Sequence, residues 1–352
     1  MKAHILSRLR NSKEAVSGEV LRAELGTSRV SVWKHIQKLQ ELGYGIVSTG
    51  KGYQLHSCPD IPFSWEFPQR EEKIHYYPET GSTMEIARDL ARKGCPHFTV
   101  VIAGRQTKGR GRLQRQWFSD EGGLYFTIVL RPEIPAVLAS RMNFAASLTL
   151  AETLRRLFGI EAGVKWPNDI LVSEKKLCGM LSEMESEADM VSFVNIGMGI
   201  NVNNDPAVFE PNAVSLKNIL GHEVSKKELL SAFLDDFEKR INQGNYETVV
   251  GEWKKHAITI GRQVRVVTTK EIFEGRAADV DKDGSLILEC EDGKRENSDL
   301  RGLFFIRIFN LHNNMKKILF HYRAAIILLI ASSISGCGIT DSRLSGKWKS
   351  RP

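Results

Sequence analysis

The chain has 352 residues, of which 42% are hydrophobic and 26% are charged, as in an ordinary globular protein of two or three domains. Its five cysteines are scattered without a CxxC pair, which argues against a disulfide framework and a structural zinc site and fits a cytoplasmic location. The net charge of +7 lies at the two ends. Residues 1–56 hold nine Lys/Arg and four acids, residues 311–352 hold seven and one, and the remainder is net acidic. Only the N-terminal excess therefore argues for nucleic acid.

The first 58 residues predict three helices and a two-stranded hairpin. Apolar residues repeat at helical spacing from Ile5 to Leu9, and Ser17 opens a second helix. Gly26 ends that helix, because glycine tolerates the left-handed backbone of a tight turn. Ser28 caps a third helix that runs through residue 39, and two short strands joined by a glycine turn would form a wing. We expect a winged helix-turn-helix DNA-binding domain over residues 1–58.

The outward face of the third helix carries side chains of the types that contact base edges and phosphates in the major groove. These candidate DNA-binding residues are Ser28, Arg29, Ser31, Lys34, His35, Gln37 and Lys38. A protein-interaction module with a solvated basic face is the alternative.

Residues 57–70 are rich in proline and aromatic residues, and we expect them to form a linker. The pattern after them predicts an α+β domain over residues 66–258, with helices on one face of a mixed sheet. The expected helices are 83–93, 141–158, 226–243 and 246–256, and the expected strands are 98–105, 124–130, 162–165, 169–172, 176–185 and 192–201. Strands at 263–268, 273–280, 285–289 and 303–308, with turns at Asp283-Gly284 and Asp292-Gly293, predict a small β-barrel over residues 259–309.

The most informative segment is GRQTKGRGRLQRQW, residues 104–117, which places five cationic residues within eleven positions. Its glycines permit close backbone approach, and guanidinium groups grip phosphate or carboxylate with two hydrogen bonds. The segment does not match the GxxxxGK[ST] P-loop pattern. It suits a loop that closes over a nucleotide and excludes water, and a basic RNA-binding or merely solvated loop is the alternative.

Three further segments place polar groups next to strands. KWPND, residues 165–169, offers amide and carboxylate groups for a ribose or a magnesium ion, although ordinary β-turn chemistry also explains it. Lys176 opens a buried strand, where a lysine partly withdrawn from water suits an anion. NIGMGIN, residues 195–201, has two glycines in an apolar strand, which indicates close approach of a ligand or another strand.

In this order, GSTM, GRQTKGRGR…W, KWPNDI, KLCGML and NIGMGINVN resemble the signature of the biotin–protein ligase family. The N-terminal helices make the chain similar to the bifunctional members, which also repress biotin synthesis. The resemblance covers about residues 1–309. It implies a winged-helix domain, a central domain of the biotin/lipoate ligase type and an SH3-like C-terminal barrel. It also implies ATP-dependent formation of biotinyl-5'-AMP and transfer of biotin to a lysine of a biotin carboxyl carrier protein.

The resemblance further implies which residues form the site. Biotin would contact Ser82, Thr83, Met84, Gln106, Arg110, Gly111, Arg112, Lys176 and Gly179, and the nucleotide would contact Trp117, Asn168, Asp169 and Asn201. Lys176, Arg110 and Arg112 would be catalytic, because biotin's carboxylate must attack the α-phosphate of ATP and both groups are anions. Mg²⁺ would arrive with ATP and lie near Asp169, not in a cage of protein ligands.

The implied partners are the carrier protein, biotin operator DNA and a second copy of the chain when the adenylate is bound, with no membrane partner for residues 1–309. Two other functions stay open: an adenylate-sensing repressor with little catalysis, and a ligase for another carboxylic cofactor such as lipoate. Met84 stands where the family commonly has asparagine, and Leu113-Gln114 replaces an Arg-Gly pair. These departures keep the first alternative open.

Residues 310–352 differ in character from the rest. Met315 precedes two lysines, a short apolar run and the sequence ISGC, which resembles a lipoprotein signal, and the apolar run is too short to span a bilayer. We expect this segment to be a neighbouring reading frame fused to the chain. A C-terminal appendage that touches a membrane is the alternative.

Overall fold

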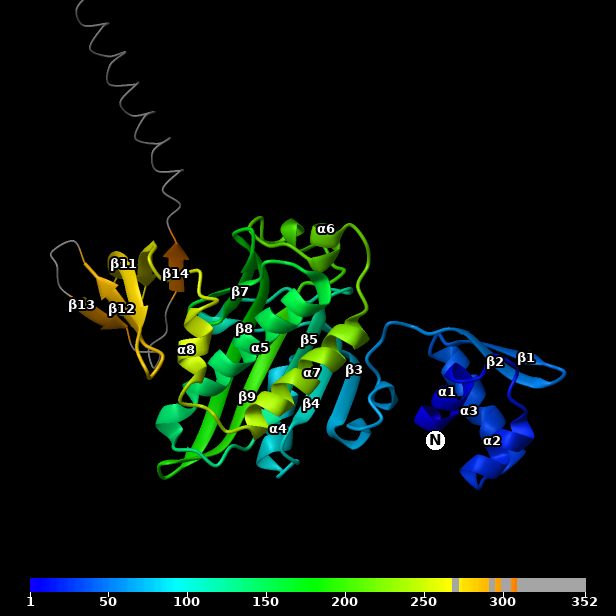
Figure 1. Cartoon of the computed structure of the whole chain (residues 1–352). Helices are drawn as coiled ribbons and strands as arrows, with labels where there is room; N and C mark the ends of the chain where they lie inside the picture. The colour runs from blue at the N-terminus through cyan, green and yellow to red at the C-terminus, as the bar shows by residue number, and fades with distance from the viewer. Residues whose placement is uncertain (268–271, 291–294, 299–304, 309–352) are drawn as a thin grey trace, which may run out of the picture. The chain divides into compact units, whose positions relative to one another are not determined.

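The structure is a computed structural model and describes residues 1–267, 272–290, 295–298 and 305–308. The N-terminal part, blue in Figure 1, comprises α1 (Lys2–Arg10), α2 (Gly18–Leu25), α3 (Arg29–Glu41), β1 (Gly45–Thr49) and β2 (Gly52–Ser57). The hydroxyls of Ser17 and Ser28 accept hydrogen bonds from backbone N–H groups in the first turns of α2 and α3, and Gly26 ends α2 with a left-handed backbone. β1 and β2 pair as an antiparallel hairpin. The predicted helices, turn and hairpin are therefore confirmed.

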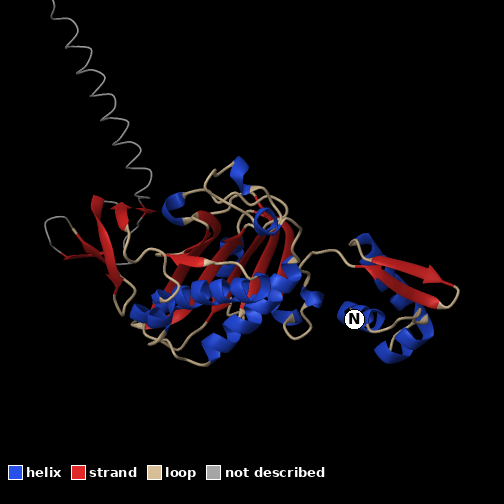
Figure 2. Ribbon diagram, turned by 45° about the horizontal axis from the view of Figure 1, so that its top comes forward, coloured by secondary structure: helices blue, strands red, loops and turns tan. Residues whose placement is uncertain are grey.

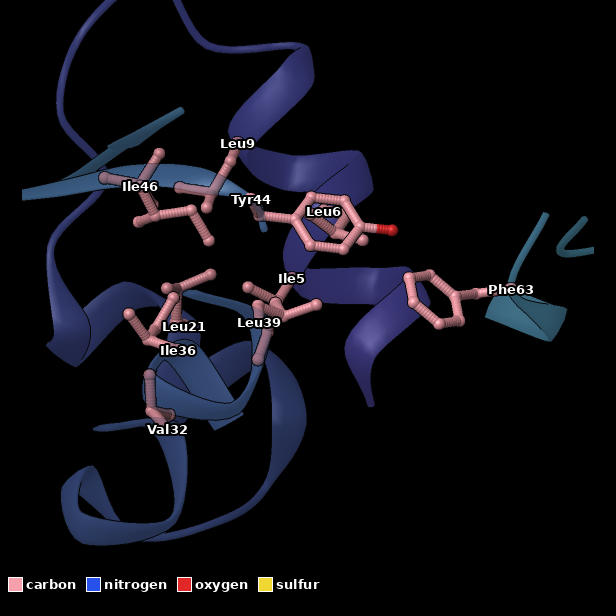
Figure 3. Close-up of a cluster of buried hydrophobic side chains, with 11 residues drawn as sticks. Ile5, Leu6, Leu9, Leu21, Val32, Ile36, Leu39, Tyr44, Ile46 and Phe63 are labelled. Carbon is pink, nitrogen blue, oxygen red and sulfur yellow. The ribbon is translucent and has the colours of Figure 1, made fainter. Parts of the chain in front are cut away.

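One apolar core holds this N-terminal part together, and Figure 3 shows its side chains. Ile5, Leu21 and Ile36 come from the three helices and are almost completely buried. Phe63, which follows the hairpin, packs into the same cluster. The segment 57–70, predicted to be a linker, thus contributes Phe63 to this core. Burial of a phenylalanine side chain stabilises a fold by about 1.5–3 kcal/mol. The same stretch forms two 3₁₀ turns, η1 (Ser64–Glu66) and η2 (Glu71–Lys73).

The central part is built on a seven-stranded sheet in the order β3-β4-β5-β9-β8-β7-β6. The strands are β3 (Ile74–Thr80), β4 (Thr99–Gln106), β5 (Leu124–Leu130), β6 (Gly163–Lys165), β7 (Asp169–Val172), β8 (Lys175–Glu187) and β9 (Met190–Ile200). Only the β3–β4 pair is parallel, so the predicted mixed sheet is confirmed. The sequence did not predict β3, which contains Pro78. As an edge strand it has an unpaired side that tolerates proline.

Helices lie on both faces of this sheet, so the prediction of helices on one face is wrong. They are α4 (Thr83–Arg92), α5 (Ser140–Phe158), α6 (Leu216–Leu220), α7 (Lys226–Asn242) and α8 (Val249–Lys254), and Figure 2 shows them with the sheet in red. Phe126 of β5 packs against Phe233 of α7, whereas Val129 of the same strand clusters with Ala87 of α4. Residues three positions apart on a strand point to opposite faces. Hence α4 covers one face of the sheet and α7 the other.

A second, antiparallel sheet follows in the order β13-β12-β11-β10-β14. Its strands are β10 (Gln263–Val267), β11 (Ile272–Val280), β12 (Leu286–Glu289), β13 (Arg295–Ser298) and β14 (Phe305–Ile308), of which β13 was not predicted. The predicted turn at Asp283-Gly284 joins β11 to β12, and the carboxylate of Asp281 accepts the backbone N–H groups of Asp283 and Ser285. The other predicted turn, Asp292-Gly293, and residues 309–352 lie outside the described residues. None of the described helices has the length and apolar character needed to cross a membrane.

Candidate active site

A cavity of about 490 Å³ opens on the face of the central sheet that α4 covers. Its walls come from the start of α4, the loop after β4, the turn between β6 and β7, strands β8 and β9, and residues 204–213. All thirteen residues predicted for biotin and the nucleotide line this cavity. The sequence motifs, which are far apart along the chain, therefore meet at one place.

One end of the cavity is a network of buried hydroxyl and amide groups. The carboxamide oxygen of Gln106 accepts the backbone N–H of Thr83 at 2.8 Å and its hydroxyl at 3.1 Å. The Gln106 nitrogen donates to Ser119 at 2.9 Å, and Thr127 donates to the Thr83 hydroxyl at 2.8 Å. Ser82 is the N-cap residue of α4, but its side chain makes no capping hydrogen bond. This end can thus present fixed donors and acceptors to a small polar ring.

Met84 brings a thioether to this end in place of an amide. A Cβ atom placed on Gly197 would lie 2.6 Å from its sulfur. The Met84 side chain therefore lies directly on the backbone of β9. It fills space and donates no hydrogen bond.

The middle of the cavity has a flat floor made by Gly179 and Gly199, which are paired across β8 and β9. A Cβ on Gly199 would lie 2.3 Å from the indole nitrogen of Trp117, and one on Gly179 would lie 2.8 Å from the same ring. Only glycine therefore lets Trp117 lie on the sheet. The indole N–H is buried and has no hydrogen-bond partner within the described part of the chain.

Lys176 and Asp169 form the charged centre of the cavity. The Lys176 ammonium lies 2.7 Å from the Asp169 carboxylate and 5.2 Å from the centre of the Trp117 ring. Both side chains are partly buried, with 33% and 17% exposed. Separating this pair would be costly in a solvent-poor site, so a substrate anion is expected to bind the Lys176 ammonium beside Asp169, through donors that the carboxylate does not use.

Two arginines of the loop after β4 face the same space. Arg110 lies 3.6 Å from the carboxylate of Glu183, and its buried Nε and Nη2 atoms make no hydrogen bond within the described residues. Burial lowers the pKa of Arg112 from its ordinary value, and the carboxylate of Asp169 opposes that shift. Buried donors without partners are costly, so the Nε and Nη2 atoms of Arg110 are suited to an incoming anion.

The loop also carries backbone strain at the position where it departs from the family pattern. Leu113 has φ +57°, the left-handed region that costs a residue with a side chain about 1–2 kcal/mol. Gly111, two residues earlier, donates its backbone N–H to the backbone carbonyl of Arg115 at 2.8 Å. The arginines are thus presented by a tight turn.

Asn168 and Asn201 lie in the wall of the cavity, and their side-chain amides donate hydrogen bonds to backbone carbonyls of neighbouring residues. The Asn168 amide donates to the carbonyl of Met180, and the Asn201 amide donates to the carbonyl of Lys176 at 3.5 Å. The Asn201 carbonyl oxygen accepts from Asn204 at 3.0 Å. In this structure both asparagines position neighbouring residues of the site.

Several groups in or beside the cavity were not predicted from the sequence, and three of them make defined contacts. Glu183 receives Arg88 as well as Arg110. Phe118 and Phe209 stack at the rim, with ring centroids 4.4 Å apart and planes at 10°, and both are more than 40% exposed. An aromatic residue within the polar run NNDPAVFEPN was the available signal for Phe209, whereas the position of Glu183 depends on sheet register.

The turn between β6 and β7 is anchored from the second sheet. The Trp166 indole donates to the carbonyl of Gly284 at 2.8 Å, and its backbone N–H donates to Thr259 at 2.9 Å. Trp166 is almost completely buried. The turn that leads into Asp169 is therefore held, at Trp166, by residues more than ninety positions further along the chain.

The predicted DNA-binding residues lie on or next to α3. Most of them are exposed, although Ser28 uses its hydroxyl as a cap and Arg29 pairs with Glu19 at 2.7 Å. The sequence reading missed two exposed apolar side chains on this helix, Val30 at 61% and Trp33 at 48%. Val30 and Trp33 are three positions apart, so their side chains are neighbours on the surface of the helix.

Comparisons with known proteins identify the family of this chain. The chain matches the Biotin/lipoate A/B protein ligase family over residues 77–203, an HTH domain over 2–54 and the Biotin protein ligase C terminal domain over 259–298. It is 35% identical over 295 residues to the bifunctional ligase/repressor BirA of Bacillus subtilis, covering 80% of this chain and 91% of the relative. The chain belongs to the biotin–protein ligase family. A second member, BirA of Escherichia coli, is 31% identical over 293 residues, covering 79% and 88%.

A solved biotin–protein ligase has the same fold. The biotin protein ligase from Aquifex aeolicus in complex with biotin and ATP matches with a TM-score of 0.58 and 29% identity, covering 67% of this chain and 99% of that one.

Proposed function

We propose that this protein is an ATP-dependent biotin–protein ligase that also represses transcription of biotin synthesis. The observation that carries the enzymatic half is the meeting of Lys176, Arg110 and Arg112 in one cavity whose other end is polar and uncharged. A carboxylic acid with a polar ring fits this arrangement, with its ring at Thr83 and Gln106 and its carboxylate at Lys176.

The cations answer the main obstacle of the first step. Biotin's carboxylate and the α-phosphate of ATP are both anions, and positive charge in a solvent-poor cavity offsets their repulsion. The carboxylate oxygen forms the new bond to phosphorus while pyrophosphate leaves with the electron pair of the broken bond. The mixed anhydride is sensitive to water, so the arginine loop would protect it until an acceptor lysine attacks its carbonyl.

Magnesium fits this site only as a companion of ATP. The described residues contain no group of three or more His, Cys, Asp or Glu side chains that could hold a metal ion. Asp169 offers one carboxylate in the cavity, and Mg²⁺ is commonly held by one or two carboxylates together with substrate phosphates. Bound there, the ion would neutralise phosphate charge.

A biotinylation assay tests the enzymatic half. The protein is incubated with biotin, ATP, Mg²⁺ and a biotin carboxyl carrier domain, and the intact mass of the carrier is measured. We expect a gain of one biotin that requires ATP. Tight binding of biotin and ATP without any mass gain would favour the sensor that lacks catalysis, which Met84 keeps open. Preferential attachment of lipoate in a competition would favour the other ligase.

The regulatory half rests on α3 and on the relatives that are named ligase/repressor. If Lys34 and Lys38 contact phosphates, binding to the protein's own upstream DNA should weaken steeply as salt rises. We propose that a second copy of the chain joins when the adenylate is bound, which would place two α3 helices on paired half-sites. Sedimentation with and without biotin plus ATP tests this, and a monomer under both conditions would remove the dimer.

The domain limits and the form of the second sheet belong to the same proposal. We infer domains at residues 1–58, 66–258 and 259–309, with the second sheet closing into an SH3-like barrel and residues 310–352 outside all three. The antiparallel order of β10 to β14 supports the last domain, whereas the core of the first domain extends to Phe63, a few residues beyond the inferred limit. Biotinylation by chains with and without residues 310–352 should be equal.

A further inference from the structure

The lysines that line the cavity are Lys176 and Lys165. The proposed adenylation uses Lys176 and assigns nothing to Lys165. It is the last residue of β6, the edge strand of the central sheet, and its Cα is paired with that of Asp169 on β7. Directly paired residues of neighbouring strands project from the same face of a sheet. Lys165 therefore shares a face with Asp169.

The pairing continues across the sheet. Asp169 is paired with Gly179, and Gly179 with Gly199. One row thus runs from the glycine floor under Trp117, past the centre where Lys176 meets Asp169, to Lys165 at the edge. With strands about 4.8 Å apart, the edge lies roughly 10 Å beyond Gly179.

Cationic side chains gather around Asp169 in this row. Lys165 is only partly exposed, and burial lowers the pKa of its ammonium while the carboxylate of Asp169 opposes that shift. The same carboxylate already contacts Lys176 and acts on Arg112. The phosphates of a nucleotide that enters the space around Asp169 would therefore be close to three cations, Lys165, Lys176 and Arg112.

The direction of the row fits an in-line displacement at phosphorus. The attacking and leaving oxygens lie on opposite sides of the transferred phosphorus. The polar end at Thr83 and Gln106 follows β3 and β4, Lys176 lies on β8, and Lys165 lies beyond it on β6. If the acid enters from the β3–β4 side and reacts at Lys176, the leaving group must point toward the β6 edge.

We propose that Lys165 holds the β- and γ-phosphates of ATP and then the departing pyrophosphate. This role rests on the proposed adenylation and assigns the leaving group to a lysine distinct from the one at the reacting carboxylate. Lysine suits it, because an ammonium binds phosphate as a point charge and does not require a fixed geometry. No proton moves in the step: the carboxylate–phosphorus bond forms and the α–β anhydride bond breaks toward pyrophosphate.

The two half-reactions test this assignment separately. Lys165→Met is compared with the unmodified protein in biotin-dependent exchange of labelled pyrophosphate into ATP, and in transfer of biotin from synthetic biotinyl-5'-adenylate to a carrier domain. We expect the KM values for ATP and pyrophosphate to rise roughly tenfold to a hundredfold, as for loss of a charged hydrogen bond. Transfer from the synthetic adenylate, which has no pyrophosphate, should change less than about twofold.

Two further variants complete the experiment. Lys165→Arg keeps the charge and should restore most of the affinity for pyrophosphate. Lys175→Met removes an exposed lysine outside the cavity and should leave both half-reactions unchanged. Unchanged KM values in Lys165→Met, or an equal loss in both half-reactions, would overturn the assignment. Absence of both half-reactions in the unmodified protein would instead overturn the proposed function.

Discussion

The surface proposed for DNA and the cavity proposed for adenylation gather their side chains in opposite ways. The first comes almost entirely from α3 and the residue before it, so its members are neighbours in sequence. The cavity takes its members from six segments between residues 82 and 213. A helix can present a row of contacts by itself, whereas a site that surrounds a substrate must be closed from several sides. Single substitutions on the DNA-binding surface should therefore weaken binding in small steps, whereas single substitutions in the cavity should remove most of the activity.

The most abrupt effect is expected at Lys176. Replacing it with glutamine removes the ammonium that lies 2.7 Å from Asp169 and should lower biotin-dependent pyrophosphate exchange on the order of a hundredfold or more. Binding of the upstream DNA without biotin should not change. Lys175→Gln, one residue earlier and exposed, is the matched control. Normal exchange by Lys176→Gln would show that the charged centre lies elsewhere.

The glycine floor should be nearly as sensitive. In Gly199→Val the new side chain would meet the Trp117 ring at less than 3 Å, so the ring must leave the sheet. We expect adenylate formation to fall roughly tenfold to a hundredfold, because the site tolerates little misplacement. Gly251→Ala in α8, where a Cβ has no neighbour within 4 Å, is the control. Full activity with valine at 199 would mean that the position of Trp117 is unimportant.

A smaller effect on folding is expected at Glu66, next to the N-terminal core. Burial alone would raise the pKa of Glu66, but hydrogen bonds from Tyr44 and Arg10 outweigh it and hold the pKa below its ordinary value of 4.5. The ionised form therefore stabilises the fold above about pH 4.5, and this contribution is lost as the pH falls further. Glu66→Gln should cost about 1–3 kcal/mol at pH 7 in urea unfolding and less at pH 3.

The control for that measurement is Glu72→Gln, an exposed position close to Glu66 in the chain. Equal costs of Glu66→Gln at both pH values would show that the carboxylate contributes no charge-dependent stability.

The most graded effect is expected on α3. Lys34→Ala should weaken DNA binding a few-fold and reduce the slope of log affinity against log salt by about 1, as for loss of one phosphate contact. Trp33→Ala, which removes an exposed ring, should weaken binding without changing that slope. Binding assays across a salt series distinguish the two. Lys93→Ala, an exposed lysine after α4, should have neither effect.

The same contrast explains which features of the fold and of the site could be predicted from the sequence. Ser17, Gly26 and Ser28 announce the helices of the N-terminal part, because capping depends on neighbours in the chain. The face on which α4 lies does not follow from local pattern, since it depends on the side of the sheet on which the chain crosses from β3 to β4. The motifs indicated the lining of the cavity, but the Glu183–Arg110 contact and the row from Gly199 to Lys165 follow from strand register. Periodicity alone does not specify register between strands distant in sequence.

The bond between Trp166 and Gly284 has a consequence for engineering. The segment from Thr259 to β14 could be taken for a module that can be deleted or exchanged, because its strands form a sheet of their own. However, the hairpin of that sheet holds the indole next to which Lys165 and Asp169 are placed. A chimaera that joins this central sheet to a foreign C-terminal sheet should still fold. It would lack the hydrogen bond from Trp166 to Gly284, so Lys165 and Asp169 would no longer be held in position. Such a swap should be designed with the β11–β12 turn retained.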